Sequence, residues 1–141
     1  MDQTGTRQVV EEYFARLNAH DTAGIRRFMP WTDEEWAPWE RSLTAMLRAF
    51  PDFRIDVEHL IVEGDKAAAL VRVTGTHTDE FPAGELEGIA ATGRRISWSE
   101  AHFSVVRDGQ FVAGGLVVDS LDRLRQLGAA TTPQGDFPPE Q

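Results

Sequence analysis

Hydrophobic residues near the start of the chain recur at helical spacing. Between residues 6 and 19 the apolar residues are separated by one, three or four positions along the sequence. They are Val9, Val10, Tyr13, Phe14 and Leu17. This pattern predicts an amphipathic helix with Thr6 as its cap. Asp21 is expected to open a short second helix, which ends by Pro30.

The next twenty residues are rich in tryptophan. Three of the four tryptophans of the chain lie here, at Trp31, Trp36 and Trp39. Thr32 and Glu35 fit a capping box, but Pro38 interrupts the pattern. We therefore expect a turn at 33–37 and a helix from Pro38 to Phe50. The tryptophans pack in the core or form a lid over a cavity.

From residue 53 onward apolar and polar residues alternate, which is the period of a strand. Strands are expected at 53–58, 67–78, 96–106 and 111–118, with a hairpin turn at 63–66, a loop at 81–92 and a last helix at 121–127. Helices followed by consecutive antiparallel strands predict an α+β fold. We expect a curved sheet wrapped around the N-terminal helices, a cone-shaped barrel with an internal cavity, as one domain over 1–128 with a flexible tail at 129–141.

Composition restricts the partners. The chain has 141 residues, a net charge of −9 and no cysteine. The negative charge argues against nucleic acid and anionic membranes as partners. Without cysteine the chain has no disulfides and no thiolate ligands for a metal. Its His, Asp and Glu residues do not have the spacing of a metal site. We therefore expect neither a metal nor a cofactor. The first residues lack a signal-peptide pattern, and a cytoplasmic protein is expected.

One strand carries unusual chemistry. Trp98, Glu100 and His102 alternate with small or apolar residues, so the three side chains share one face of the sheet. An imidazole titrates near neutrality, and a partly buried carboxyl group can approach it. Glu100 and His102 are therefore candidates for acid/base catalysis, and the indole of Trp98 is a candidate to stack on a flat ligand.

Six short motifs, in this order, resemble the SnoaL-like polyketide cyclases of the nuclear-transport-factor-2-like superfamily. They are Phe50-Pro51-Asp52-Phe53-Arg54, Leu60-Ile61-Val62-Glu63-Gly64-Asp65, Gly75-Thr76-His77-Thr78, Thr92-Gly93-Arg94-Arg95, Arg107-Asp108-Gly109 and the segment from Asp119 to Gly128. The resemblance covers most of 50–128. It implies a cofactor-free intramolecular aldol cyclisation in an apolar cavity.

The resemblance also implies an acid/base pair on the last two strands. Its histidine falls on His102, and its aspartate would fall on Leu116. We therefore expect Glu100 to replace the missing base. Asp119 is kept as a third catalytic candidate, although its position before Ser120 also fits a helix cap.

Eight residues are expected to contact the substrate. They are Trp98, Trp39, Trp36, Phe14, Tyr13, Leu116, His77 and Val71. Gly114 and Gly115 put two residues without side chains in the last strand. They either make room for a ligand or form a bulge.

Three functions remain open at this point. The first is ring closure of a hydrophobic, polyketide-like substrate. The second is another reaction in the same cavity, such as hydration, dehydration, epoxide opening or assistance to hydroxylation. The third is ligand binding without chemistry. The family resemblance and the mixed surface of Arg72, Thr74 and Thr76 also predict a homodimer through the outer face of the sheet.

Overall fold

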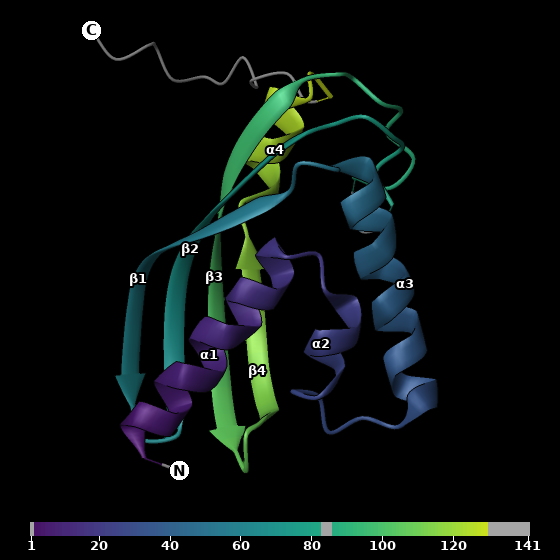
Figure 1. The fold of residues 1–141 in the computed structure, drawn as a ribbon. Helices are drawn as coiled ribbons and strands as arrows, with labels where there is room; N and C mark the ends of the chain where they lie inside the picture. Colours follow the sequence, from purple (N-terminus) through teal and green to yellow (C-terminus); the bar gives the residue numbers. More distant parts are fainter. Residues whose placement is uncertain (1, 83–85, 130–141) are drawn as a thin grey trace, which may run out of the picture.

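A computed structural model describes residues 2–82 and 86–129 of the chain. Residues 83–85 of the expected loop and 130–141 of the expected tail lie outside this part. Three helices come first, then four strands and a fourth helix (Figure 1). The bounds are α1 Gln3–Asn18, α2 Thr22–Arg26, α3 Asp33–Ala49, β1 Arg54–Glu63, β2 Lys66–Thr76, β3 Arg95–Arg107, β4 Gln110–Val118 and α4 Ser120–Gln126.

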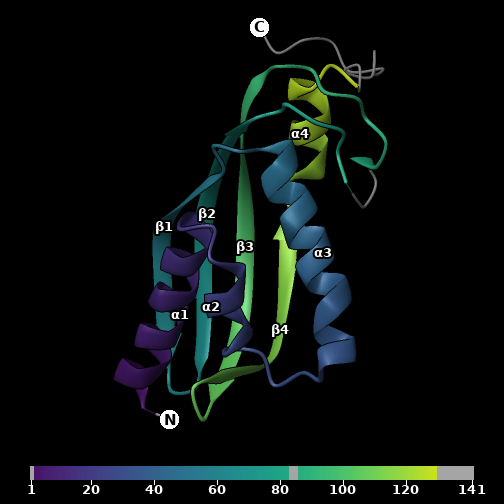
Figure 2. The same cartoon turned by 45° about the vertical axis from the view of Figure 1, so that its right-hand side comes forward.

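The strands form one antiparallel sheet in the order β1-β2-β3-β4. The sheet curves, and α1, α2 and α3 lie on one of its faces, while α4 packs at the end where β3 begins (Figures 1 and 2). This arrangement confirms the predicted α+β fold with a curved antiparallel sheet. No helix of the described part is long and apolar enough to cross a membrane.

The first helix starts earlier than predicted. Asp2, and not Thr6, is the N-cap of α1, since its carboxylate accepts a hydrogen bond from the Gly5 N–H at 2.8 Å. Thr6 is fully buried, and its hydroxyl donates to the Gly64 carbonyl in the β1–β2 turn at 2.8 Å. A buried hydroxyl needs such a partner, so Thr6 ties the helix to the sheet instead of capping it.

The expected turn at 33–37 is wrong, because α3 runs from Asp33 through Pro38 without interruption. The capping box of Thr32 and Glu35 is present, as the sequence suggested. It fixes the start of the helix, and Trp36 and Trp39 then stack with ring centroids 4.9 Å apart. A proline this close to the N-terminus removes only one helical hydrogen bond, which these contacts outweigh.

A bulge divides β1 between Val57 and His59. Ile55 faces the core before the bulge, and Leu60 and Val62 pack against the core after it. The two-residue alternation therefore changes phase inside the strand. This phase change explains why the predicted strand stopped at residue 58, five residues short of the observed end at Glu63.

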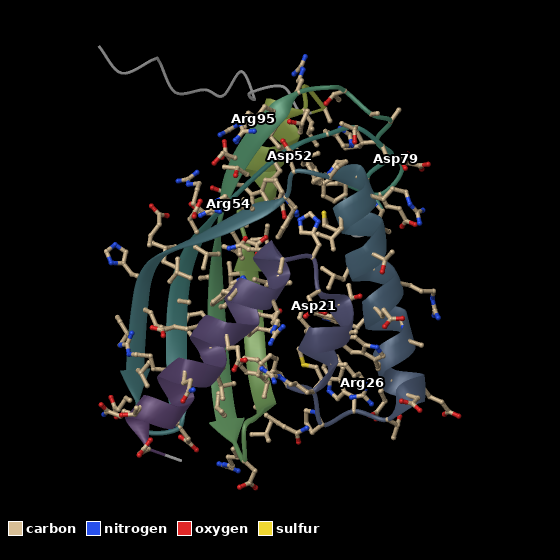
Figure 3. The ribbon with its side chains drawn as sticks, viewed as in Figure 1. Asp21, Arg26, Asp52, Arg54, Asp79 and Arg95 are labelled. Carbon is tan, nitrogen blue, oxygen red and sulfur yellow. The ribbon has the colours of Figure 1, made fainter. Side chains whose placement is uncertain are left out.

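A carboxylate fixes the end of the sheet near α3. Asp52 accepts hydrogen bonds from the N–H and the hydroxyl of Thr76 at 2.6 and 2.7 Å and contacts Arg95 at 3.3 Å. Figure 3 shows Asp52 and Arg95 beside each other there. The hydrogen bond from the Thr76 backbone lowers the pKa of Asp52, with smaller contributions from the Thr76 hydroxyl and Arg95.

The edge strand β4 holds two adjacent glycines with different surroundings. A Cβ built on Gly114 would lie 2.5 Å from the carbonyl oxygen of Phe103, whereas a Cβ on Gly115 would meet nothing within 4 Å. Gly114 is therefore required for the close approach of β3 and β4, and Gly115 is not.

This difference predicts opposite effects of one substitution. Gly114→Ala should lower the free energy of unfolding by about 1–3 kcal/mol, because backbone atoms must move. Gly115→Ala should leave it unchanged or raise it by about 0.4–1 kcal/mol, because the unfolded chain loses freedom. Urea unfolding followed by tryptophan fluorescence measures both. Equal destabilisation by the two variants would contradict the prediction.

Candidate functional site

A pocket of about 330 Å³, open to solvent on one side, lies between the helices and the last two strands. Its aromatic wall comes from α1, from the segment before α3 and from α3 itself, and from the start of β4, with Tyr13, Phe14, Trp31, Trp39 and Phe111. His102 of β3 and Leu116 of β4 form part of the opposite wall. The structure thus shows an open pocket on the expected face. The enclosed cavity stays a prediction.

Three side chains of β3 form a hydrogen-bonded row. The Trp98 indole N–H donates to Oε2 of Glu100 at 2.8 Å, and Nε2 of His102 lies 2.9 Å from Oε1 of the same carboxyl group. The side chains of Glu100 and His102 are only 13% and 17% exposed. The two-residue period of the strand places these groups on one face, as the sequence predicted.

His102 is held against the aromatic wall. Its ring contacts the Phe14 ring edge-on, with centroids 5.2 Å apart. Across the strands it pairs directly with Leu116. Leu116 therefore occupies the position beside the histidine where the family resemblance implies an aspartate. The carboxylate next to His102 comes instead from Glu100, two residues away on the same strand.

Tyr13 lies in the same pocket and has an unused hydroxyl. Its ring packs edge-on against Phe14, Phe28 and Phe111, with centroids 5.4, 6.5 and 5.1 Å away. In the described part of the chain the hydroxyl has no hydrogen-bond partner. Burial and, to a smaller extent, the negative charge of Glu100 raise the pKa of Tyr13 above its ordinary value. Tyr13 is therefore a neutral donor near neutral pH.

Four of the residues expected to contact the substrate do not line this pocket. Trp98 and Val71 are buried in the core at 1% and 0% exposure. Trp36 is also buried and donates its indole N–H to Glu40 at 2.8 Å. All three side chains pack in the core. The periodicity of a helix or strand indicates which face a residue occupies and not how deeply it is buried.

His77 is the fourth, and it belongs to another part of the core. It is fully buried, stacks on Phe50 and accepts a hydrogen bond from the Thr92 N–H on Nδ1 at 3.2 Å. Burial lowers the pKa of His77, opposed by the nearby backbone and charge of Asp79. The neutral ring therefore packs in the core and does not line the pocket.

Asp119 is a helix cap and lies outside the pocket lining. Its carboxylate accepts a hydrogen bond from the Asp122 N–H at 3.2 Å at the start of α4. This agrees with the alternative reading of its sequence context. The pocket contact of Phe111 was missed, since its strand pattern carried no sign of it. Trp31, which the sequence predicts as core or lid, also lines the pocket.

The matches to known proteins agree with this geometry. The model of the SnoaL-like polyketide cyclase family matches residues 37–127, so the chain belongs to this family. A comparison with curated proteins gave no match. Within residues 2–82 and 86–129, no three His, Cys, Asp or Glu side chains are grouped to hold a metal ion.

Solved structures share the whole fold. AclR from Streptomyces galilaeus, a proposed hydroxylase, is 26% identical with a TM-score of 0.79 over 92% of this chain and 100% of that chain. TsrD from Streptomyces laurentii is 25% identical with a TM-score of 0.78 over 92% and 99%. IdmH from Streptomyces antibioticus, a proposed polyketide cyclase, shows the fold alone at 23% identity, with a TM-score of 0.72 over 87% and 98%.

Tyr13 is the only tyrosine of the chain, so its ionisation can be followed directly by ultraviolet absorbance. We expect it to ionise above the ordinary pKa of about 10. Glu100→Gln should lower this pKa without restoring the ordinary value, because burial remains and only the repelling charge is removed. Glu58→Gln, which changes an exposed carboxylate, is the control. The assignment fails if Glu100→Gln and Glu58→Gln give the same titration curve.

Proposed function

We propose that this chain is a polyketide cyclase-like enzyme that closes a ring in a hydrophobic small molecule by acid/base catalysis. The observation that supports it is the His102–Glu100 pair, held at 2.9 Å beside an aromatic-walled pocket. A sequence without cysteine suits a reducing compartment, and the cytoplasm is the location we propose.

His102 is the base in this proposal, and Glu100 orients it. An ionised carboxylate only accepts hydrogen bonds, so Nε2 of His102 carries the proton that faces Glu100. Nδ1 then keeps its lone pair for a substrate proton. Of the two candidate bases on this strand, His102 is the one with a free nitrogen, because both oxygens of Glu100 already accept a hydrogen bond.

The reaction transfers one proton in each direction. Nδ1 of His102 removes a proton from a carbon next to a carbonyl group, which leaves an enolate and an imidazolium. The enolate carbon attacks a second carbonyl carbon of the same molecule, and a carbon–carbon bond forms. The imidazolium returns the proton to the new alkoxide oxygen. Glu100 stays charged throughout and stabilises the imidazolium.

Tyr13 supplies the hydrogen bond to the substrate oxygen. Tyr13 lines the same pocket, and its neutral hydroxyl has no hydrogen-bond partner in the described part of the chain. A donor fixed by three aromatic neighbours needs no reorganisation when negative charge develops on the enolate oxygen.

The aromatic wall binds and folds the substrate. Tyr13, Phe14, Trp31, Trp39 and Phe111 offer ring faces and edges to a flat unsaturated molecule. Holding two carbonyl-bearing carbons of one molecule in contact can supply about 7–11 kcal/mol of barrier lowering. The protein therefore has to provide shape and one base, and the substrate provides both reacting carbons.

Oxygenation of the same kind of substrate is the second candidate. It is favoured by the likeness to AclR, a proposed hydroxylase, and by Leu116 beside His102. Product mass distinguishes the two, since aldol closure leaves the elemental composition unchanged and oxygenation under ¹⁸O₂ adds labelled oxygen.

Proton abstraction can be tested without the natural substrate. We expect the protein to accelerate exchange of the α-hydrogens of 2-tetralone, a flat aromatic ketone, in D₂O. His102→Ala should lower the rate about 10²–10⁴-fold, because the base is lost, and Glu100→Gln should lower it less. NMR measures the exchange. His59→Ala, an exposed histidine on β1, is the matched control. Undiminished exchange in both pocket variants would remove the basis of the proposal.

A second copy of the chain is the proposed protein partner. The face of the sheet opposite the helices carries exposed apolar side chains, at Ile61, Leu70, Phe103 and Val117. The strand register places Ile61, Ala68 and Phe103 in one row across the sheet. A continuous exposed apolar surface of this kind favours association, and two such flat faces fit each other.

Ile61→Lys tests this partner. Ile61 is 70% exposed and lies on the opposite face from the pocket, so the variant should fold normally. We expect sedimentation to show a dimer for the unmodified chain and a monomer for Ile61→Lys, because two buried charges would face an apolar surface. Leu121→Lys, an exposed leucine of α4, should remain dimeric. A monomeric unmodified chain would exclude the dimer.

A further inference from the structure

We propose that Trp98 is a positioning residue, whose buried indole N–H holds Glu100 so that His102 presents Nδ1 to the pocket. This inference deepens the proposed function and rests on it. Trp98 was expected to touch the substrate from the pocket wall. Its place in the row with Glu100 and His102 gives it a different role, which acts through the carboxylate.

Trp98 cannot move freely, and this makes it a suitable anchor. It is 1% exposed, packs edge-on against Phe50 at 5.5 Å and lies under the guanidinium of Arg123 at 5.3 Å. These contacts fix the direction of the indole N–H. The hydrogen bond of 2.8 Å to Oε2 of Glu100 then fixes the plane of the carboxyl group.

The fixed carboxylate determines which nitrogen of His102 carries the proton. With Oε2 occupied by the indole, Oε1 is the oxygen that faces Nε2 at 2.9 Å. A hydrogen bond donated to a carboxylate stabilises its charged form, and a charged Glu100 requires a donor on the histidine. The Nε2–H tautomer follows, and the lone pair is on Nδ1.

Without the indole N–H, Glu100 would lose this restraint. The carboxyl group could rotate or take up a proton, and either change permits His102 to adopt the other tautomer. The pocket would keep its shape, because Trp98 does not line it. The expected defect is therefore in proton transfer and not in ligand binding.

The test replaces Trp98 by 3-benzothienylalanine, which keeps the shape of the side chain and lacks the N–H. Long-range ¹H–¹⁵N NMR of histidine-labelled protein then reads the His102 tautomer, with His102→Asn used to assign its signals. We expect the ratio of Nε2–H to Nδ1–H to fall roughly ten-fold, the effect of losing one hydrogen bond to a charged group. Trp98→Phe should lower kcat for 2-tetralone exchange and leave KM unchanged.

The same replacement at Trp36 is the matched control. Trp36 also donates its indole N–H to a carboxylate, Glu40, at 2.8 Å. It should leave the His102 tautomer unchanged. An unchanged ratio in the Trp98 variant, or an equal change in the Trp36 variant, would overturn the positioning role. The NMR measurement needs no substrate, so a wild-type protein that fails to exchange 2-tetralone would refute the proposed function separately.

Discussion

The site depends on a carboxylate that is shared between two nitrogen donors. Glu100 is nearly buried, and a charge in such a place is costly unless its oxygens are satisfied. The Trp98 indole and the His102 imidazole satisfy one oxygen each. The pair and its anchor are consecutive inner-face residues of one strand, so the backbone of β3 sets their spacing without help from a loop.

This arrangement differs from one that takes its acid from the neighbouring strand. The position across from His102 holds Leu116, which adds an apolar side chain to the pocket wall. Because the carboxylate beside His102 comes from β3, the residue of β4 across from the histidine can be apolar. The last strand is then free to contribute backbone and small side chains, and Gly114 permits its close approach to Phe103.

Much of the fold could be predicted from the sequence, because alternation and helical spacing are local properties. The face shared by Trp98, Glu100 and His102 followed from the period of the strand alone. What failed were features set by contacts between distant residues. Thr6 bonds to Gly64 instead of capping its helix. The continuation of α3 through Pro38 also escaped prediction, because the helix is supported by its capping box and by the stacked rings of Trp36 and Trp39. Depth is equally hidden in the sequence, which does not show that Trp98 and Val71 are buried in the core and do not line the pocket.

For the proposed cyclisation, the open side of the pocket has a kinetic consequence. Water that reaches an enolate can reprotonate it, which returns the starting material with exchanged hydrogen and no new bond. Formation of product then depends on whether the enolate attacks the second carbonyl carbon before water reprotonates it. In this proposed reaction the aromatic wall would decide the partition, because it would set how long the two ends of the substrate stay within reach of each other. Substrates with stiff, pre-folded backbones would commit to product more often than flexible ones of the same chemistry.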